Sequence, residues 1–191
     1  KKIPVFSRSD ILAWILNSSN GIAISGTHGK TTTTSMISLI FRGLGLDPII
    51  MVGGELNELG SNARYGKGDY VIAEACESDG SFLKYKPYVS VVTNIEGDHF
   101  DFYKNIDEIK QSFAKFIENT KAGGLVVLNG DEICLNDLLG TDDKQIIYYG
   151  ISNKNHIYAE NIKFSNFTSS YDLVARTNRK LKKIKVKLSI A

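Results

Sequence analysis

Short apolar runs alternate with helical periodicity over residues 1–150. The runs at 21–25, 48–52, 69–75, 88–94, 124–131 and 145–150 predict buried strands. Apolar positions recur at helical spacing over 7–17, 30–44 and 105–119, with Ser7 or Ser9 available to cap the first of these helices. Alternation of this kind is typical of a mostly parallel sheet covered by helices on both faces. The pattern therefore predicts a three-layer α/β/α domain, with a short additional helix at 131–139.

The pattern changes after Gly150, where no helical periodicity remains. The segments 156–164, 170–176 and 183–190 predict short strands. In the last segment apolar residues alternate with lysines, which indicates a sheet with one solvated face. No aromatic residues interleave with these lysines as stacking platforms, so we expect a solvated face rather than a nucleic-acid surface. Residues 151–191 are thus expected to form a small antiparallel β-sheet of the same domain.

Composition adds little to this picture but excludes some classes of protein. The chain has 191 residues, 42% hydrophobic and 23% charged, with a net charge of +2, which gives no general argument for nucleic acid or an anionic membrane. No apolar run approaches the roughly 20 residues of a membrane span. Cys76 and Cys134 lack metal-site spacing, and free thiols favour a cytoplasmic location. Because the chain lacks an initial Met and ends within a strand pattern, we expect a piece of a longer protein.

The stretch GTHGKT at 26–31 lies between a predicted strand and a predicted helix. Gly26 and Gly29 permit tight turns, and the N-terminus of the following helix is electropositive. Lys30 can reach a β- or γ-phosphate, and the Thr31 hydroxyl can bind Mg²⁺. The full Walker pattern asks for a glycine where Ile24 stands, so the match is the shorter form GxxGKT. We interpret the stretch as a P-loop, with a merely solvated strand–helix turn as the alternative.

Acidic residues and a histidine follow two further predicted strands. The carboxyl ends of parallel strands meet at the edge where a P-loop lies, so these side chains are expected near it. Oxygen ligands suit Mg²⁺, and a histidine can join at a second metal position. Each cluster alone could be a helix cap or a solvated turn, but together with the loop they favour a metal–nucleotide site. The residues are Glu74, Glu77 and Asp79 after the first strand, and Glu96, Asp98, His99 and Asp101 after the second.

Three motifs, GTHGKTTTT, EACESDGSFL and VTNIEGDHFDFY, resemble in order and spacing the ATP-dependent Mur ligases of bacterial peptidoglycan synthesis. The resemblance covers essentially the whole chain and implies the central one of three domains. Residues 1–20 would be a connector from an N-terminal UDP-binding domain, 21–150 the P-loop ATP-binding core, and 151–191 the small sheet. The C-terminal ligase domain would be absent, and the fragment alone is expected to be inactive.

The resemblance also implies roles for individual residues. Lys30 would contact the ATP phosphates, Thr31 and Glu74 would hold the Mg²⁺ that bridges them, and His99 would bind a second divalent metal near the acceptor carboxylate. Lys30, Glu74 and His99 would be the catalytic residues. Asn94 and Asp98 belong to the same motif without an assigned role, and Cys76 and Gly97 replace residues more common in the family. The ATP loop would comprise Gly26, Thr27, His28, Gly29, Lys30, Thr31 and Thr32.

The implied reaction joins L-alanine to UDP-N-acetylmuramate through an acyl phosphate, with ATP converted to ADP and phosphate. Ser78 favours this member of the family over the murein tripeptide ligase, which usually has a tyrosine there. The implied partners are these small molecules and the flanking domains, with no nucleic acid and no membrane. Alternatives are the murein tripeptide ligase, a folylpolyglutamate synthetase-like ligase, a P-loop binding module without ligase activity, and a structural domain with a fortuitous loop.

Overall fold

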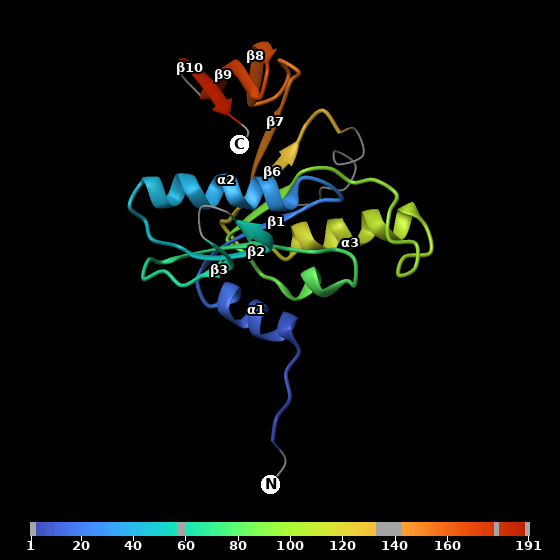
Figure 1. Ribbon diagram of the computed structural model, residues 1–191. Coiled ribbons are helices and arrows are strands. Elements are labelled where there is room, and N and C mark those ends of the chain that lie inside the picture. The colour runs from blue at the N-terminus through green and yellow to red at the C-terminus, as the bar shows by residue number, and fades with distance from the viewer. Residues whose placement is uncertain (1–2, 57–59, 133–142, 178–179, 190–191) are drawn as a thin grey trace.

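The structure is a computed structural model that describes residues 3–56, 60–132, 143–177 and 180–189 (Figure 1). Within these residues the strands form a single ten-stranded sheet in the order β10-β9-β8-β7-β6-β5-β1-β4-β2-β3. The strands are β1 (Asn20–Ser25), β2 (Ile49–Leu56), β3 (Ser61–Arg64), β4 (Tyr70–Glu74), β5 (Val89–Val92), β6 (Leu125–Asn129), β7 (Gln145–Gly150), β8 (Ile157–Ser165), β9 (Thr168–Thr177) and β10 (Lys180–Ser189).

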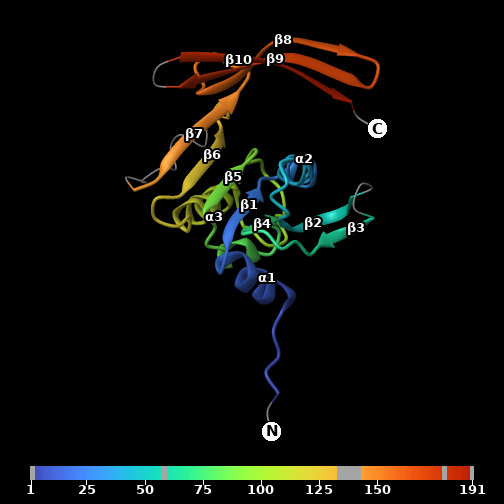
Figure 2. The same ribbon diagram turned by 90° about the vertical axis from the view of Figure 1, so that its left-hand side faces the viewer.

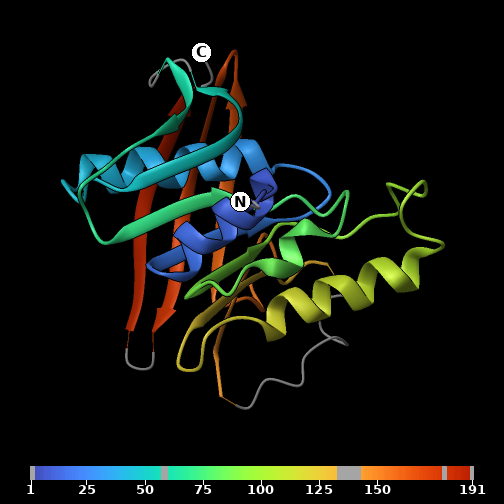
Figure 3. The same ribbon diagram turned by 90° about the horizontal axis from the view of Figure 1, so that it is seen from below.

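Helices cover both faces of the central strands, as the sequence pattern predicts. The helices are α1 (Arg8–Asn17), α2 (Lys30–Gly43) and α3 (Ile106–Glu118), with a 3₁₀ helix η1 (Ser81–Lys84). On one face, α1, η1 and α3 enclose a core that includes Leu16, Phe82 and Phe113, all fully buried. On the other face, Ile37 and Phe41 of α2 pack against strand residues. Figures 1 and 3 show α2 on the opposite side of the sheet from α1 and α3, so the three-layer α/β/α prediction is confirmed.

The centre of the sheet is parallel and buried. Strand β1 lies between β4 and β5 and pairs with both in parallel. Every residue of β1 after Asn20 is buried, which explains why this strand appears in the sequence as a continuous apolar run. Strands β2, β6 and β7 extend the parallel sheet on either side. The loops that follow β1, β4 and β5 therefore all begin at the same edge of the sheet.

The C-terminal strands are antiparallel, as predicted, with β9 paired to both β8 and β10. They continue the main sheet, because β8 pairs in parallel with the end of β7. The Asp131 carboxylate stabilises this junction by accepting hydrogen bonds from the Ile151 and Ser152 amides and from Asn155. These hydrogen bonds hold the pKa of Asp131 below its ordinary value. Figure 2 shows β8–β10 beyond α2, on the side of the sheet away from α1.

Some elements differ from the sequence predictions or extend them. The short polar strand β3, which forms an antiparallel edge on β2, was not predicted, nor was η1. Helix α1 begins after a Ser7 N-cap, and its buried Leu16 packs into the main core, so most of the segment 1–20 is part of the folded domain. The expected helix at 131–139 falls mostly outside the described residues. Among the described residues, no helix is both long and apolar enough to cross a membrane.

The aromatic contacts of Phe82 give a test of this packing. Phe82 is fully buried, and its ring centroid lies 5.3 Å from that of Phe116 and 5.4 Å from that of Phe113. We expect Phe82→Ala to lower the free energy of unfolding by about 3–5 kcal/mol, because the truncation leaves a cavity between η1 and α3. Urea unfolding measures this change. Phe164→Ala is the matched control, since Phe164 is 82% exposed, and an equal effect of the two substitutions would contradict the assigned core.

Candidate functional site

The loop between β1 and α2 requires glycine at two positions. Gly26 has φ = 139° and Gly29 has φ = 81°, both unfavourable for residues with a side chain. A Cβ atom on Gly26 would also lie 2.0 Å from the Thr93 hydroxyl oxygen. Gly29 is the N-cap of α2. The turn therefore runs close to the segment after β5 and directs the N-terminus of α2 toward the edge of the sheet.

Residues after β5 hold this loop in place. The Asn94 side chain accepts a hydrogen bond from the His28 amide at 2.8 Å and donates one to the His28 carbonyl at 3.2 Å. The Thr93 hydroxyl donates to the same carbonyl at 2.6 Å. The Thr27 hydroxyl accepts from the Glu96 amide at 2.9 Å. Asn94, to which the sequence motif assigns no role, thus fixes the conformation of the loop.

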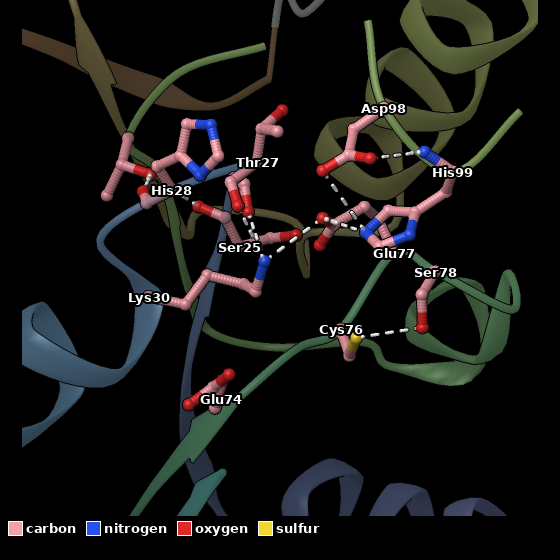
Figure 4. A network of polar contacts seen from close by, with 12 residues as sticks. Ser25, Thr27, His28, Lys30, Glu74, Cys76, Glu77, Ser78, Asp98 and His99 are labelled. Carbon is pink, nitrogen blue, oxygen red and sulfur yellow. Dashed lines mark hydrogen bonds and ion pairs between the residues drawn. The ribbon is translucent and has the colours of Figure 1, made fainter. Parts of the chain in front are cut away.

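The Lys30 side chain lies back over the loop (Figure 4). Its ammonium donates to the Gly26 carbonyl at 2.6 Å, to the Thr27 carbonyl at 3.1 Å and to Glu77 Oε1 at 3.0 Å. The Lys30 side chain is 12% exposed and that of Glu77 only 2%. A charged pair this deeply buried is stable only when each partner compensates the other. Lys30 is thus positioned at the loop together with a buried carboxylate.

Thr31 and Glu74, which are predicted to share a metal ion, are in direct contact. The Thr31 hydroxyl donates to Glu74 Oε2 at 2.9 Å, and the Gly53 amide donates to the same oxygen at 2.9 Å. A Cβ atom on Gly53 would lie 2.7 Å from Glu74 Oε1, so only glycine allows this approach. A hydroxyl and a carboxylate side by side offer the oxygen ligands that Mg²⁺ prefers.

His99 reaches the site from the loop after β5. Its Nε2 lies 3.5 Å from Glu77 Oε1, and its backbone is left-handed with φ = 55°. The amides of Phe102 and Tyr103 both donate to the His99 carbonyl, which closes a tight turn. The buried Tyr103 hydroxyl donates to the Glu77 carbonyl at 2.6 Å, and burial raises the pKa of this phenol. Tyr103 therefore holds the loop with His99 against the loop with Glu77.

The three residues predicted to be catalytic lie at one edge of the sheet. Lys30 and His99 meet at Glu77, and Glu74 lies next to Thr31, the neighbour of Lys30 (Figure 4). In the sequence, Glu77 is one of several acidic residues beyond a predicted strand. The available signal was its place just beyond a strand end, but no local pattern showed that it would be buried. In the described part of the chain, no three His, Cys, Asp or Glu side chains are grouped to hold a metal by themselves.

The remaining loop residues lie at the rim of the site. The His28 side chain is 65% exposed, with Nε2 3.8 Å from Glu96 Oε2. Thr32 is exposed on the first turn of α2. Asp98 is half-exposed, and its carboxylate accepts a hydrogen bond from the His99 amide at 2.7 Å. These side chains are accessible to a ligand at the loop but do not form its buried part.

A cavity of about 450 Å³ opens beside Glu74. It lies between the start of α1, the middle of β2 and the end of β4, and its walls include Arg8, Gly53, Ser78 and Asp79. Hydrogen bonds from Ser81 lower the pKa of Asp79, so this wall of the cavity stays negatively charged. Through Glu74, which lines it, the cavity adjoins the Thr31–Glu74 contact.

Comparisons with known proteins identify the family of this chain. Residues 24–191 match the family model of the Mur ligase middle domain. A UDP-N-acetylmuramate–L-alanine ligase from Geotalea uraniireducens is 48% identical over 169 residues, which cover 88% of this chain and 37% of the relative. One from Dictyoglomus turgidum is 43% identical over 98% of this chain and 40% of the relative. The chain thus spans about two fifths of the length of these relatives.

Solved structures show the same fold. The UDP-N-acetylmuramate–alanine ligase from Thermotoga maritima matches with a TM-score of 0.77 and 25% identity, over 96% of this chain and 39% of that one. The UDP-N-acetylmuramate:L-alanyl-γ-D-glutamyl-meso-diaminopimelate ligase from Neisseria meningitides matches with a TM-score of 0.78 and 26% identity, over 91% of this chain and 57% of that one. By its sequence, its fold and the family model that spans most of its length, this chain belongs to the Mur ligase middle domain family.

Proposed function

We propose that this chain is the ATP-binding domain of a ligase that joins L-alanine to UDP-N-acetylmuramate in peptidoglycan precursor synthesis. The observation that supports this most is the meeting of three loops at one edge of the sheet, which brings Lys30, the Thr31–Glu74 contact and the Glu77–His99 contact together. The 42–48% identity to UDP-N-acetylmuramate–L-alanine ligases supports the choice of substrates. A structural neighbour, MurF from Thermotoga maritima, was solved with ADP.

The proposed chemistry has two steps. An oxygen of the UDP-N-acetylmuramate carboxylate attacks the γ-phosphorus of ATP, and ADP leaves. The L-alanine amine then attacks the acyl carbon, loses a proton, and phosphate leaves as the amide bond forms. The first step brings a carboxylate against a triphosphate, so positive charge at the γ-phosphate must offset both their repulsion and the charge of the transition state. The amides of the 26–32 loop would supply part of this charge, as would Lys30 once its ammonium turns from the Gly26 and Thr27 carbonyls and Glu77 toward the phosphates.

The donor set at this edge of the sheet fits divalent metal ions. The Thr31 hydroxyl and the Glu74 carboxylate would hold a Mg²⁺. His99 would bind a second divalent cation on the side of the acceptor carboxylate. Such ions, when bound, neutralise phosphate charge and orient the reacting oxygens. The cavity beside Glu74 would admit the acceptor to this edge of the sheet.

The proposed enzyme needs more than this domain. The relatives are more than twice as long as the chain, and we propose that a UDP-binding domain and an amino-acid-binding domain act together with this one. The domain alone is then expected to bind nucleotide without forming the amide bond.

Substrate choice is the first test of the proposal. We expect the intact protein that contains this domain to release phosphate with UDP-N-acetylmuramate and free L-alanine, and not with the tripeptide L-alanyl-γ-D-glutamyl-meso-diaminopimelate. The structural match to the tripeptide ligase makes that substrate the relevant competitor. A phosphate-release assay with each amino donor separates them, and preference for the tripeptide would overturn the assignment.

Removal of the Lys30 ammonium tests the phosphate loop. In the intact ligase, Lys30→Met is expected to reduce kcat by a factor of about 10²–10³, because a transition-state electrostatic contact is lost. The same change leaves Glu77 buried without its partner, so Lys30→Met/Glu77→Gln removes both charges and separates loss of chemistry from loss of folding. Lys86→Met is the control, since Lys86 is exposed. Wild-type turnover by either Lys30 variant would exclude Lys30 from the mechanism.

Removal of one charge at Glu74 tests the first metal position. Glu74→Gln is expected to weaken Mg²⁺-dependent nucleotide binding by roughly 10–150-fold, the effect of losing one charge-assisted contact. Isothermal titration calorimetry with a non-hydrolysable ATP analogue, with and without Mg²⁺, measures the change. Glu118→Gln serves as the control, because Glu118 is exposed at the end of α3. Unchanged affinity for the Mg²⁺ complex would rule out Glu74 as a ligand.

A further inference from the structure

Glu77 is a buried carboxylate whose two oxygens have different surroundings. Its side chain is 2% exposed. Oε1 lies 3.0 Å from the Lys30 ammonium and 3.5 Å from His99 Nε2. Oε2 is buried and has no hydrogen-bond partner among the described residues. Native proteins rarely leave a buried charged oxygen unsatisfied, so this atom indicates a missing cationic or donor ligand.

The contacts of Lys30 conflict with its proposed role at the phosphates. An ammonium has three donors, and here they point to Gly26 O, Thr27 O and Glu77 Oε1. Lys30 can contact a phosphate only if at least one of these hydrogen bonds breaks. The structure therefore shows the lysine in a form that must rearrange when nucleotide enters the loop.

The contact with Glu77 is the one whose loss has the largest consequence. If Lys30 moves toward phosphate, the carboxylate stays buried with less compensating charge, and an uncompensated buried charge is strongly unfavourable. A cation must then approach Glu77 from another direction. The neighbouring groups with lone pairs for a metal are His99 Nε2, at 3.5 Å from Glu77, and the half-exposed Asp98, whose Oδ2 lies 3.9 Å from that nitrogen.

We propose that the Glu77 carboxylate binds two cations in turn. It holds the Lys30 ammonium before nucleotide binds, and with His99 it holds a divalent cation once Lys30 has moved to the phosphates. This inference rests on the proposed function and extends it, because it makes Glu77 a metal ligand and couples the second cation to nucleotide entry. A carboxylate and an imidazole leave open positions for phosphate and acceptor oxygens, which suits a metal between two substrates.

The fold supports this exchange because it holds the backbones of Glu77 and His99 in place. The Tyr103 hydroxyl hydrogen-bonds the Glu77 carbonyl, and the turn after His99 is closed by two amides that donate to the His99 carbonyl. Glu77 and His99 are thus positioned from their backbones, independently of Lys30. The lysine, with its long and flexible side chain at the start of α2, is the partner that can move.

The test measures cation stoichiometry and metal-free nucleotide affinity in the intact ligase. With a non-hydrolysable ATP analogue and Mn²⁺, electron paramagnetic resonance is expected to count two bound Mn²⁺ in the wild type and one in Glu77→Gln. In EDTA, Glu77→Gln is expected to bind the analogue more tightly than the wild type, on the order of tenfold, because Lys30 no longer has to leave a carboxylate. If Glu77 had a purely structural role, its substitution would neither remove one bound Mn²⁺ nor tighten nucleotide binding in EDTA.

Three further variants separate the two roles. His99→Gln is expected to lose the second Mn²⁺ without gaining metal-free affinity, because its Lys30–Glu77 contact remains. Glu77→Asp keeps the charge and guards against a folding failure of Glu77→Gln; a second Mn²⁺ bound more weakly than in the wild type supports the proposal. Asp107→Asn, an exposed residue in the first turn of α3, is the control for lost negative charge.

The outcomes are distinct from those for the proposed function. Two tightly bound Mn²⁺ in Glu77→Gln, or unchanged or weaker metal-free nucleotide binding by this variant, would overturn the role of Glu77. Failure of the proposed function would instead appear as wild-type turnover in the Lys30 variants and unaltered affinity for the Mg²⁺–nucleotide complex in Glu74→Gln, whatever Glu77 does.

Discussion

The parallel pairing of β1 with both β4 and β5 fixes where the functional loops begin. Each loop starts at the carboxyl end of its strand, so the P-loop has the Glu74–Glu77 segment on one side and the Asn94–His99 segment on the other. Residues separated by as many as 69 positions in sequence thereby come into hydrogen-bonding contact, as between Thr27 and Glu96. The buried apolar residues of β1 hold this arrangement by packing against helices on both faces.

The electrostatics of the site follow from a difference in burial between the carboxylates of Glu74 and Glu77. Glu74 contacts Thr31 and the Gly53 amide and lines a cavity of about 450 Å³. Glu77 is enclosed, so its charge needs a close partner at every stage. Burial strengthens the interaction between Glu77 and any cation beside it, because the local dielectric is low. The pair of acids can therefore act on different cations although only two residues separate them in sequence.

Local patterns made part of this site predictable. The glycines, Lys30 and Thr31 stand in a recognisable order between a strand and a helix, and Glu74 and His99 follow strands whose apolar runs are clear. The role of Asn94 as a clamp on His28 and the contact of Glu77 with Lys30 were not predictable, because both depend on which loops become neighbours. The edge strand β3 escaped prediction because it is short and mostly polar and, within the described part of the chain, pairs with β2 alone. The antiparallel strands were predicted from alternation, but alternation does not specify that β8 would pair with β7.

The most direct measurement of the central claim is a crystal structure of the intact protein with Mn²⁺ and a non-hydrolysable ATP analogue. We expect the β- and γ-phosphates to lie on the amides of the 26–32 loop, within hydrogen-bonding distance of Lys30 Nζ. An anomalous Mn²⁺ peak should lie between Thr31 and Glu74, and the γ-phosphate should face His99. A nucleotide bound elsewhere on the domain, or one whose phosphates contact neither Lys30 nor a metal held by Glu74, would contradict the claim that these loops form a phosphoryl-transfer site.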